Sequence, residues 1–276
     1  MQPALRFDKI EKTQEMAGET MDRKNEYIAV FDSGVGGISV LRQLRRELPQ
    51  ERFLYFGDSA NAPYGERSVE EVRALTLAAA RMLMSRGDKA LVVACNTATA
   101  AAIKLLRQEY PDEIIIGIEP AVKLAASHFP HGRIGVMATR VTLQQERFDD
   151  LLARHGGGAE VARIPAPGLV ELIEQGKADS EETQALLSDI LEPWRGKLDA
   201  LVLGCTHYPF VKKAIARILG QQTELLDGSY GTARETRRRL EEAGLLRCGQ
   251  GQVVIEDSAP GEAALCLARQ LLEQPE

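Results

Sequence analysis

Two cysteines each follow a short apolar run directly. Cys95 comes after "ALVVA" and precedes "NTAT", and Cys205 comes after "ALVLG" and precedes "THYP". A thiol has an ordinary pKa of about 8.5, so it can give or accept a proton if its neighbours hold the required protonation state. Two thiols facing each other across a gap could therefore invert a carbon centre. One would remove a proton from one face, and the other would return a proton to the opposite face.

Ionisable residues follow Cys205 closely in the sequence, and others follow a different predicted strand at the same kind of strand end. Asp32 and Ser33 end the apolar run "IAVF", and His207 follows Cys205 by two positions. Glu174, in "LVELIEQG", is a helix residue that would be exposed unless the fold brings it to the histidine. An imidazole or a carboxylate within hydrogen-bond distance can take the proton of a thiol and return it. We therefore expect Asp32 to assist one thiol, and His207 with Glu174 to assist the other.

The same residues leave other functions open. Cys95, Cys205 and His207 could bind zinc, but no CxxC or HxxxH spacing supports a zinc site. A papain-like nucleophile would leave one cysteine unexplained, and a dithiol redox pair would close the space needed for a ligand. No lysine stands in a convincing context for a pyridoxal Schiff base. A protein that only binds an amino acid is a further alternative, although binding alone needs no thiol.

The glycines in "FDSGVGG" raise the question of a phosphate-binding loop. Their spacing is G-x-G-G, which differs from the dinucleotide-binding G-x-G-x-x-G pattern. Asp32, which precedes them, would repel a phosphate. We expect Gly34 to Gly37 instead to let the backbone pass close to a small ligand.

The elements that must position these residues follow an α/β pattern. Amphipathic segments such as "ISVLRQLRREL", in which Ile38, Leu41, Leu44 and Leu48 share one helical face, separate short apolar runs. Strands that alternate with helices predict βαβ units and a mostly parallel sheet, whose ligands bind beyond the carboxyl ends of the strands. The apolar runs predict buried strands at 27–31, 52–56, 90–94, 114–118, 133–138, 160–165, 200–204 and 223–227.

Two pairs of similar segments indicate an internal duplication. "IAVFDSGVGG" begins at Ile28 and "IGVMATRVT" at Ile134, an offset of 106 residues. "LVVACNTAT" begins at Leu91 and "LVLGCTHYP" at Leu201, an offset of 110 residues. The nearly equal offsets predict two related α/β units, the second inserted into the first. If the units face one another across a cleft, the two cysteines approach it from opposite sides.

Composition limits the class of partner and the compartment. The 276 residues carry a formal net charge of −6, which argues against a nucleic acid as the main partner. No apolar run approaches the roughly 20 residues that span a bilayer, and residues 1–25 lack the apolar region of a secretory signal. The four cysteines form no close-spaced disulfide framework. We expect a cytoplasmic protein without a membrane partner.

Taken together, these motifs resemble the glutamate racemases of the aspartate/glutamate racemase family. The resemblance covers about residues 27–270 and runs in order through "FDSGVGGISVL", "YFGDSANAPYGERS", "VVACNTATA", "IEPAVK", "GVMATRVT", "LVLGCTHYPF" and "DGS". It implies an isomerase that interconverts L- and D-glutamate without a cofactor or a metal and supplies D-glutamate for bacterial peptidoglycan. It also implies two pseudo-symmetric α/β domains with the active site in the cleft between them. The first domain would comprise residues 26–120 and 229–276, and the second residues 121–228.

The resemblance also assigns roles to single residues. Cys95 would exchange a proton with D-glutamate and Cys205 with L-glutamate, and Asp32, His207 and Glu174 would assist them. The substrate would be held by a polar set made up of Asp32, Ser33, Pro63, Tyr64, Gly65, Asn96, Thr97, Thr139, Thr142, Thr206 and His207.

Partners other than glutamate are implied by the same resemblance. Residues 1–25 are similar to the N-terminal extension of some Gram-negative members, which helps bind the activator UDP-N-acetylmuramoyl-L-alanine. The alternative is that this segment is only a leader or a tail. Members of the family are monomers or form different dimers, so a monomer or a homodimer is expected here.

Overall fold

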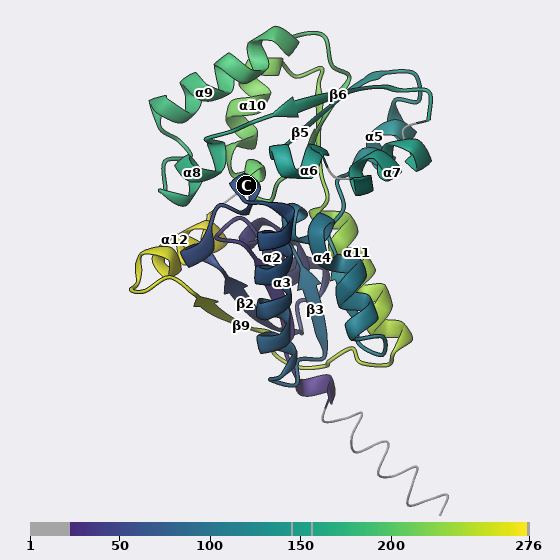
Figure 1. Ribbon diagram of the computed structural model, residues 1–276, viewed down its shortest axis with the longest axis vertical. Coiled ribbons are helices and arrows are strands. Elements are labelled where there is room, and N and C mark those ends of the chain that lie inside the picture. The colour runs from purple at the N-terminus through teal and green to yellow at the C-terminus, as the bar shows by residue number, and fades with distance from the viewer. Residues whose placement is uncertain (1–22, 145, 156, 275–276) are drawn as a thin grey trace, which may run out of the picture.

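The computed structural model describes residues 23–144, 146–155 and 157–274. The expected N-terminal extension therefore lies almost entirely outside the described residues. Figure 1 shows two α/β units, one above the other, with the yellow C-terminal segment placed beside the blue N-terminal unit.

The first unit is built on a parallel sheet in the strand order β4-β3-β1-β2-β9. Successive side chains of a strand point to opposite faces, and each face is covered by helices. Ile28 and Val30 share a core with α2, α11 and α12, whereas Ala29 and Phe31 share a core with α3 and α4. The elements are β1 (Ile28–Asp32), α2 (Ile38–Glu47), β2 (Arg52–Gly57), α3 (Val69–Met84), β3 (Ala90–Val93), α4 (Asn96–Glu109), β4 (Ile115–Gly117), α11 (Ser229–Glu242), β9 (Gln252–Asp257) and α12 (Ala263–Glu273).

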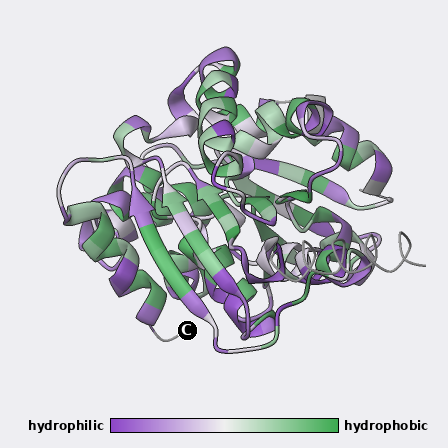
Figure 2. Cartoon of the chain, turned by 90° about the horizontal axis from the view of Figure 1, so that it is seen from below, coloured by the Kyte–Doolittle hydropathy of each residue, from purple (hydrophilic) through white to green (hydrophobic). Residues whose placement is uncertain are grey.

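The second unit is built on a parallel sheet in the order β6-β5-β7-β8. One face packs against α8, α9 and α10, and the other against α5 and α7. Figure 2 shows hydrophobic residues along the strands of the molecule, with hydrophilic residues between hydrophobic ones around the helices. The elements are α5 (Val122–His128), β5 (Arg133–Ala138), α6 (Arg140–Gln144), α7 (Glu146–His155), β6 (Glu160–Pro165), α8 (Leu169–Glu174), α9 (Glu181–Leu191), β7 (Ala200–Leu203), α10 (Lys212–Leu219) and β8 (Glu224–Asp227).

The two sheets repeat one topology. The order β4-β3-β1-β2 of the first sheet matches the order β8-β7-β5-β6 of the second, with β1 equivalent to β5 and β3 equivalent to β7. These are the strand pairs that the sequence offsets matched. The predicted fold class, two related parallel α/β units, is confirmed, and so are the predicted strands. The exact domain boundaries stay a prediction.

Strand β9 was not expected from the sequence. It pairs with β2 at the edge of the first sheet, and its residues are half-buried or exposed. Its apolar residues, Val253 to Ile255, form a run too short to distinguish a strand from a loop. With α11 and α12, it brings the chain back to the first unit after the second unit is complete (Figure 1).

The chain crosses between the units at two adjacent places. A Cβ atom added to Gly228 would overlap the carbonyl oxygen of Glu119, so only glycine allows the return crossing to lie against the outgoing one. None of the helices in the described part of the chain is long and apolar enough to cross a membrane. Within the described residues, short 3-10 helices lie at Ser59–Asn61, Tyr64–Glu66, Glu192–Trp194 and Tyr208–Val211.

Candidate active site

Cys95 lies between the end of β3 and the first turn of α4. Its sulfur accepts a hydrogen bond from the backbone N–H of Ala98 at 3.4 Å and thereby caps the helix. The thiol donates to the hydroxyl oxygen of Ser33 at 3.5 Å. Burial and, secondarily, the negative charge of Asp32 raise the pKa of Cys95 to about 12. Cys95 is therefore a protonated thiol at neutral pH, ready to donate rather than to accept.

Cys205 has a different environment at the equivalent end of β7. Its sulfur lies 3.6 Å from Nδ1 of His207, and Nε2 of the same ring lies 2.5 Å from a carboxylate oxygen of Glu174. Burial alone would lower the pKa of His207, but the hydrogen bonds and charges of Cys205 and Glu174 outweigh it and raise this pKa well above 6.5. An imidazolium at this position donates to sulfur on one side and to carboxylate on the other.

Glu174 connects the two units. It ends α8, and its Oε1 accepts both the His207 contact and the backbone N–H of Val35 at 2.8 Å. The side chain is only 17% exposed, so it is not a solvent-facing helix residue. The fold thus brings Glu174 to the histidine, 33 residues away along the chain.

The glycine loop after β1 has no side chains at two positions that side chains of the second unit approach closely. A Cβ atom at Gly34 would overlap the Glu174 carboxylate, and one at Gly36 would overlap the His207 ring. The sequence predicts that these glycines let the backbone pass close to a small ligand. In the structure, the groups that approach the backbone here are the two side chains.

Asp32 is fully buried at the end of β1 and faces the second unit. Its carboxylate accepts the hydroxyl of Thr206 at 3.0 Å and the backbone N–H of Gly34 at 3.2 Å. Burial raises the pKa of Asp32 to about 6, although the charge of His207 and the Thr206 hydrogen bond act in the opposite direction. The charges of Asp32 and of Cys205 both act on Cys95, so both groups lie within electrostatic range of this thiol.

A cluster of hydroxyl groups joins the units beside Cys95. The Thr97 hydroxyl lies 3.1 Å from that of Thr139 and 3.2 Å from that of Thr142. Gly65 packs against this cluster, because a Cβ atom there would lie 2.7 Å from the Thr139 methyl group. The side-chain oxygen of Asn96 is buried and has no hydrogen-bond partner.

The remaining predicted residues lie around the same region. Tyr64 is buried and donates its hydroxyl to Asp58 at 2.6 Å, and Pro63 lines a surface groove together with Glu174.

Among the described residues, no group of three or more His, Cys, Asp or Glu is arranged to hold a metal ion. The other two cysteines, Cys248 and Cys266, are exposed.

Sequence reasoning missed three residues that support the site. Asp58 accepts the Tyr64 hydroxyl, Ser39 donates to the carbonyl of Thr206 at 2.8 Å, and Tyr55 donates to the carbonyl of Gly34 at 2.5 Å. Asp58 directly follows β2, just as Asp32 ends β1. Applying the same strand-end argument to β2 would have identified it.

Comparison with known proteins identifies the family. The family model described as Asp/Glu/Hydantoin racemase matches residues 36–236. The chain belongs to this family. It is therefore an isomerase, an amino-acid racemase, as the sequence motifs predicted.

Individual members of the family are similar over most of their length. A glutamate racemase of Clostridium botulinum is 44% identical over 256 residues, which cover 92% of this chain and 99% of that protein. The crystal structure of a glutamate racemase isoform from Bacillus anthracis gives a TM-score of 0.83 at 32% identity, covering 91% of this chain and 95% of that one. Escherichia coli glutamate racemase, in complex with L-glutamate and the activator UDP-MurNAc-Ala, gives 0.78 at 30% identity, covering 89% and 95%.

The substitution Asp32→Asn tests the buried carboxylate of the racemase. The ordinary pKa is 3.8 and the folded value is about 6, so the folded state holds this proton to a higher pH than the unfolded state does. The resulting stabilisation is complete below pH 4 and is lost as the pH rises through 6, by about 3 kcal/mol. Urea unfolding from pH 4 to 7 should show this fall in the wild type and in the surface control Asp112→Asn. Asp88 also has a pKa raised to about 6, so the fall should become smaller by about 3 kcal/mol in Asp32→Asn, and a fall of undiminished size would contradict the assignment.

The substitution Glu174→Gln tests the link to His207. Removing the carboxylate charge while keeping an amide of similar shape should lower the pKa of His207, because Glu174 is one of the two groups that raise it. NMR titration of the imidazole carbon resonances measures this change. Glu171→Gln, one turn earlier on α8, is the control and should leave the pKa of His207 unchanged. An unchanged midpoint in Glu174→Gln would argue against the link.

Proposed function

We propose that the chain is a glutamate racemase that interconverts L- and D-glutamate by proton transfer between two cysteines, without a cofactor. One observation carries this proposal: Cys95 and Cys205 are buried at equivalent strand ends of two related units, each with its own acid or base. The glutamate racemases similar in sequence support glutamate as the substrate.

The environments of the two thiols support an assignment of which thiol removes the proton of L-glutamate and which delivers a proton to form D-glutamate. His207 can hold the proton that Cys205 gives up, so Cys205 takes the Cα proton of L-glutamate. Cys95, whose pKa is raised to about 12, keeps its proton and delivers it to the opposite face of Cα. The product is D-glutamate, with Cys205 now a thiol and Cys95 a thiolate. The reverse reaction begins from that state.

Resetting the enzyme after each turnover needs groups that exchange protons near neutral pH. Asp32, with a pKa of about 6, lies within electrostatic range of Cys95, and His207 contacts Cys205 directly. Each can pass a proton between its thiol and water that enters with the substrate. A carboxylate or an imidazole suits this task, because its pKa lies closer to the working pH than that of a buried thiol.

Polar groups around the thiols suit an amino-acid zwitterion. Hydroxyls and amides donate to carboxylates or accept from ammonium without competing as bases at Cα. Fixing Cα between the two sulfurs contributes to the rate through orientation. We assign substrate binding to Ser33, Pro63, Tyr64, Gly65, Asn96, Thr97, Thr139, Thr142 and Thr206, together with Asp32 and His207.

Replacing either thiol tests the two-cysteine mechanism. Cys95→Ser and Cys205→Ser should each lower the racemisation rate at least about 100-fold, because a hydroxyl cannot replace the thiol as acid and base. Circular dichroism of L-glutamate after chelator treatment of the enzyme measures the rate. Solvent deuterium at Cα reports proton exchange, and a parallel assay with aspartate tests the substrate. Cys248→Ser is the exposed control, and near-wild-type turnover in either active-site variant would exclude the mechanism.

We also propose that the racemase acts in the cytoplasm in the supply of D-glutamate for peptidoglycan, and that a precursor of this polymer activates it. The Escherichia coli relative, crystallised with UDP-MurNAc-Ala, supports an activator of this kind. UDP-N-acetylmuramoyl-L-alanine should increase the turnover of the full chain and should lose this effect when residues 1–22 are removed. Turnover that saturating precursor leaves unchanged would exclude the activator.

A further inference from the structure

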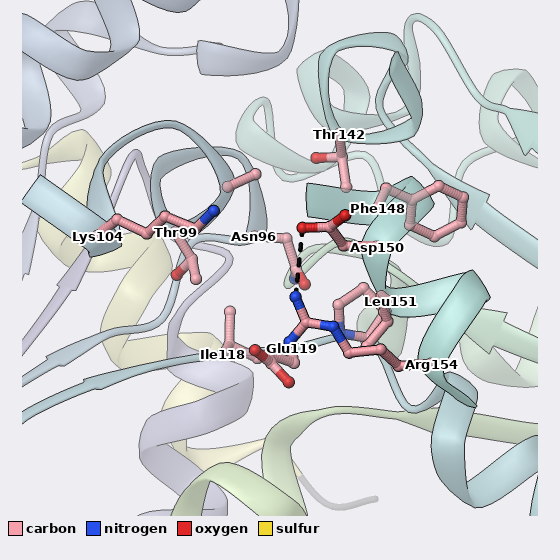
Figure 3. A pocket seen from close by; sticks show the side chains of 12 residues that line it. Asn96, Thr99, Lys104, Ile118, Glu119, Thr142, Phe148, Asp150, Leu151 and Arg154 are labelled. Atoms are coloured by element: carbon pink, nitrogen blue, oxygen red, sulfur yellow. Dashed lines mark hydrogen bonds and ion pairs between the residues drawn. The ribbon is translucent and has the colours of Figure 1, made fainter. Parts of the chain in front are cut away.

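A cavity of about 120 Å³ lies between α4 of the first unit and α6 and α7 of the second (Figure 3). Asn96, Ala100 and Lys104 recur at helical spacing along the side of α4 that lines it. Thr142 and Arg154 line it from the second unit. This volume can hold several water molecules.

Two residues that line the cavity, Asn96 and Thr142, also border the candidate active site. Asn96 directly follows Cys95, and Thr142 is bonded to the Thr97 hydroxyl. Asn96 is 6% exposed, and its side-chain oxygen has no partner, although buried amide oxygens are normally hydrogen-bonded. An unpaired acceptor at this point fits a ligand that donates to it, as an ammonium group does.

The exposed side of the cavity carries an arginine that is held only by an exposed ion pair. Arg154 is hydrogen-bonded to Asp150 at 3.3 Å, and the two side chains are 69% and 51% exposed. Such exposed pairs contribute little stability, so another carboxylate can replace Asp150 at low cost. Lys104 lies on the opposite wall, and Glu119 is the second acid among the lining residues. Because the chain as a whole carries −6, local cations matter for an anionic substrate.

On the opposite side of the site, bonds join the units beside a surface groove whose charged lining residues, Glu171 and Glu174, disfavour an anionic substrate. Glu174 accepts the Val35 N–H at 2.8 Å, and Ser39 donates to the Thr206 carbonyl at 2.8 Å. Cys95 and Cys205 are only 5% and 7% exposed, so a substrate needs a passage to reach them.

We propose that the cavity between α4 and α7 is this passage, and that Arg154 draws anionic amino acids into it by exchanging Asp150 for the substrate carboxylate. The inference rests on the proposed racemase function, for which the passage supplies the route to the thiols. Arg154 is a specificity residue at the entrance and takes no part in the proton transfers.

Alkylation of the thiols tests the passage without relying on catalysis. Iodoacetamide is neutral and iodoacetate is anionic, and mass spectrometry measures how fast each modifies Cys95 and Cys205. Ala100→Trp fills the passage and should slow both reagents at the buried thiols at least tenfold. Leu105→Trp, exposed on α4 outside the cavity, is the matched control. Exposed Cys248 should react equally fast in every protein, and unchanged rates at both buried thiols in Ala100→Trp would overturn the passage.

Charge changes at the entrance test the role of Arg154. Arg154→Gln should slow iodoacetate about threefold at the buried thiols, and Asp150→Asn should accelerate it about threefold, while iodoacetamide reacts as before. Lys213→Gln, on α10 away from the cavity, is the control for charge. Equal effects on both reagents, or none on iodoacetate, would overturn the entrance role. A wild type that alkylates as expected but does not racemise glutamate would instead refute the proposed function.

Discussion

The carboxylate of Glu174 holds the two units together at the point where their strands end. One oxygen accepts both a backbone N–H from the first unit and the imidazole of the second. This shared acceptor fixes the His207 ring against Cys205, and it also fixes the loop after β1 that carries Asp32. The glycines of that loop are required because any side chain there would displace the acceptor or the ring. The geometry around Cys205 and Asp32 therefore depends on this contact, and the threonine cluster joins the units beside Cys95.

Neighbouring charges give the two thiols unlike properties, although both thiols are buried and their strands are equivalent. Cys95 faces the negative charge of Asp32, and Cys205 faces a protonated imidazole. One is consequently a proton donor at rest, and the other has a neighbour that can hold its proton. A duplicated scaffold thus provides the opposite positions that inversion needs, while the residues after each strand provide the difference between acid and base.

The sequence predicted the strands, the repeat and the strand-end residues because each of these is encoded locally. Buried parallel strands are continuous apolar runs, and the residue after such a strand faces the ligand edge of the sheet. Strand β9 was not predicted from the sequence, because an edge strand is half-exposed and its apolar run is short. Glu174 could be named as a candidate, but its burial depends on Val35, 139 residues away, and no local pattern records such a contact. Asp58 was missed only because the strand-end argument was not applied to β2. The unpaired oxygen of Asn96 depends on which donors the fold places near it, and no local pattern in the sequence records this.

The two crossings between the units, at Glu119 and Gly228, lie against each other, since a Cβ atom at position 228 would overlap the Glu119 carbonyl oxygen. A larger side chain at position 228 would therefore have to push the two connections apart. Such a displacement would alter how the two halves meet, and with it the placement of Cys95 relative to Cys205, although it would touch neither sulfur.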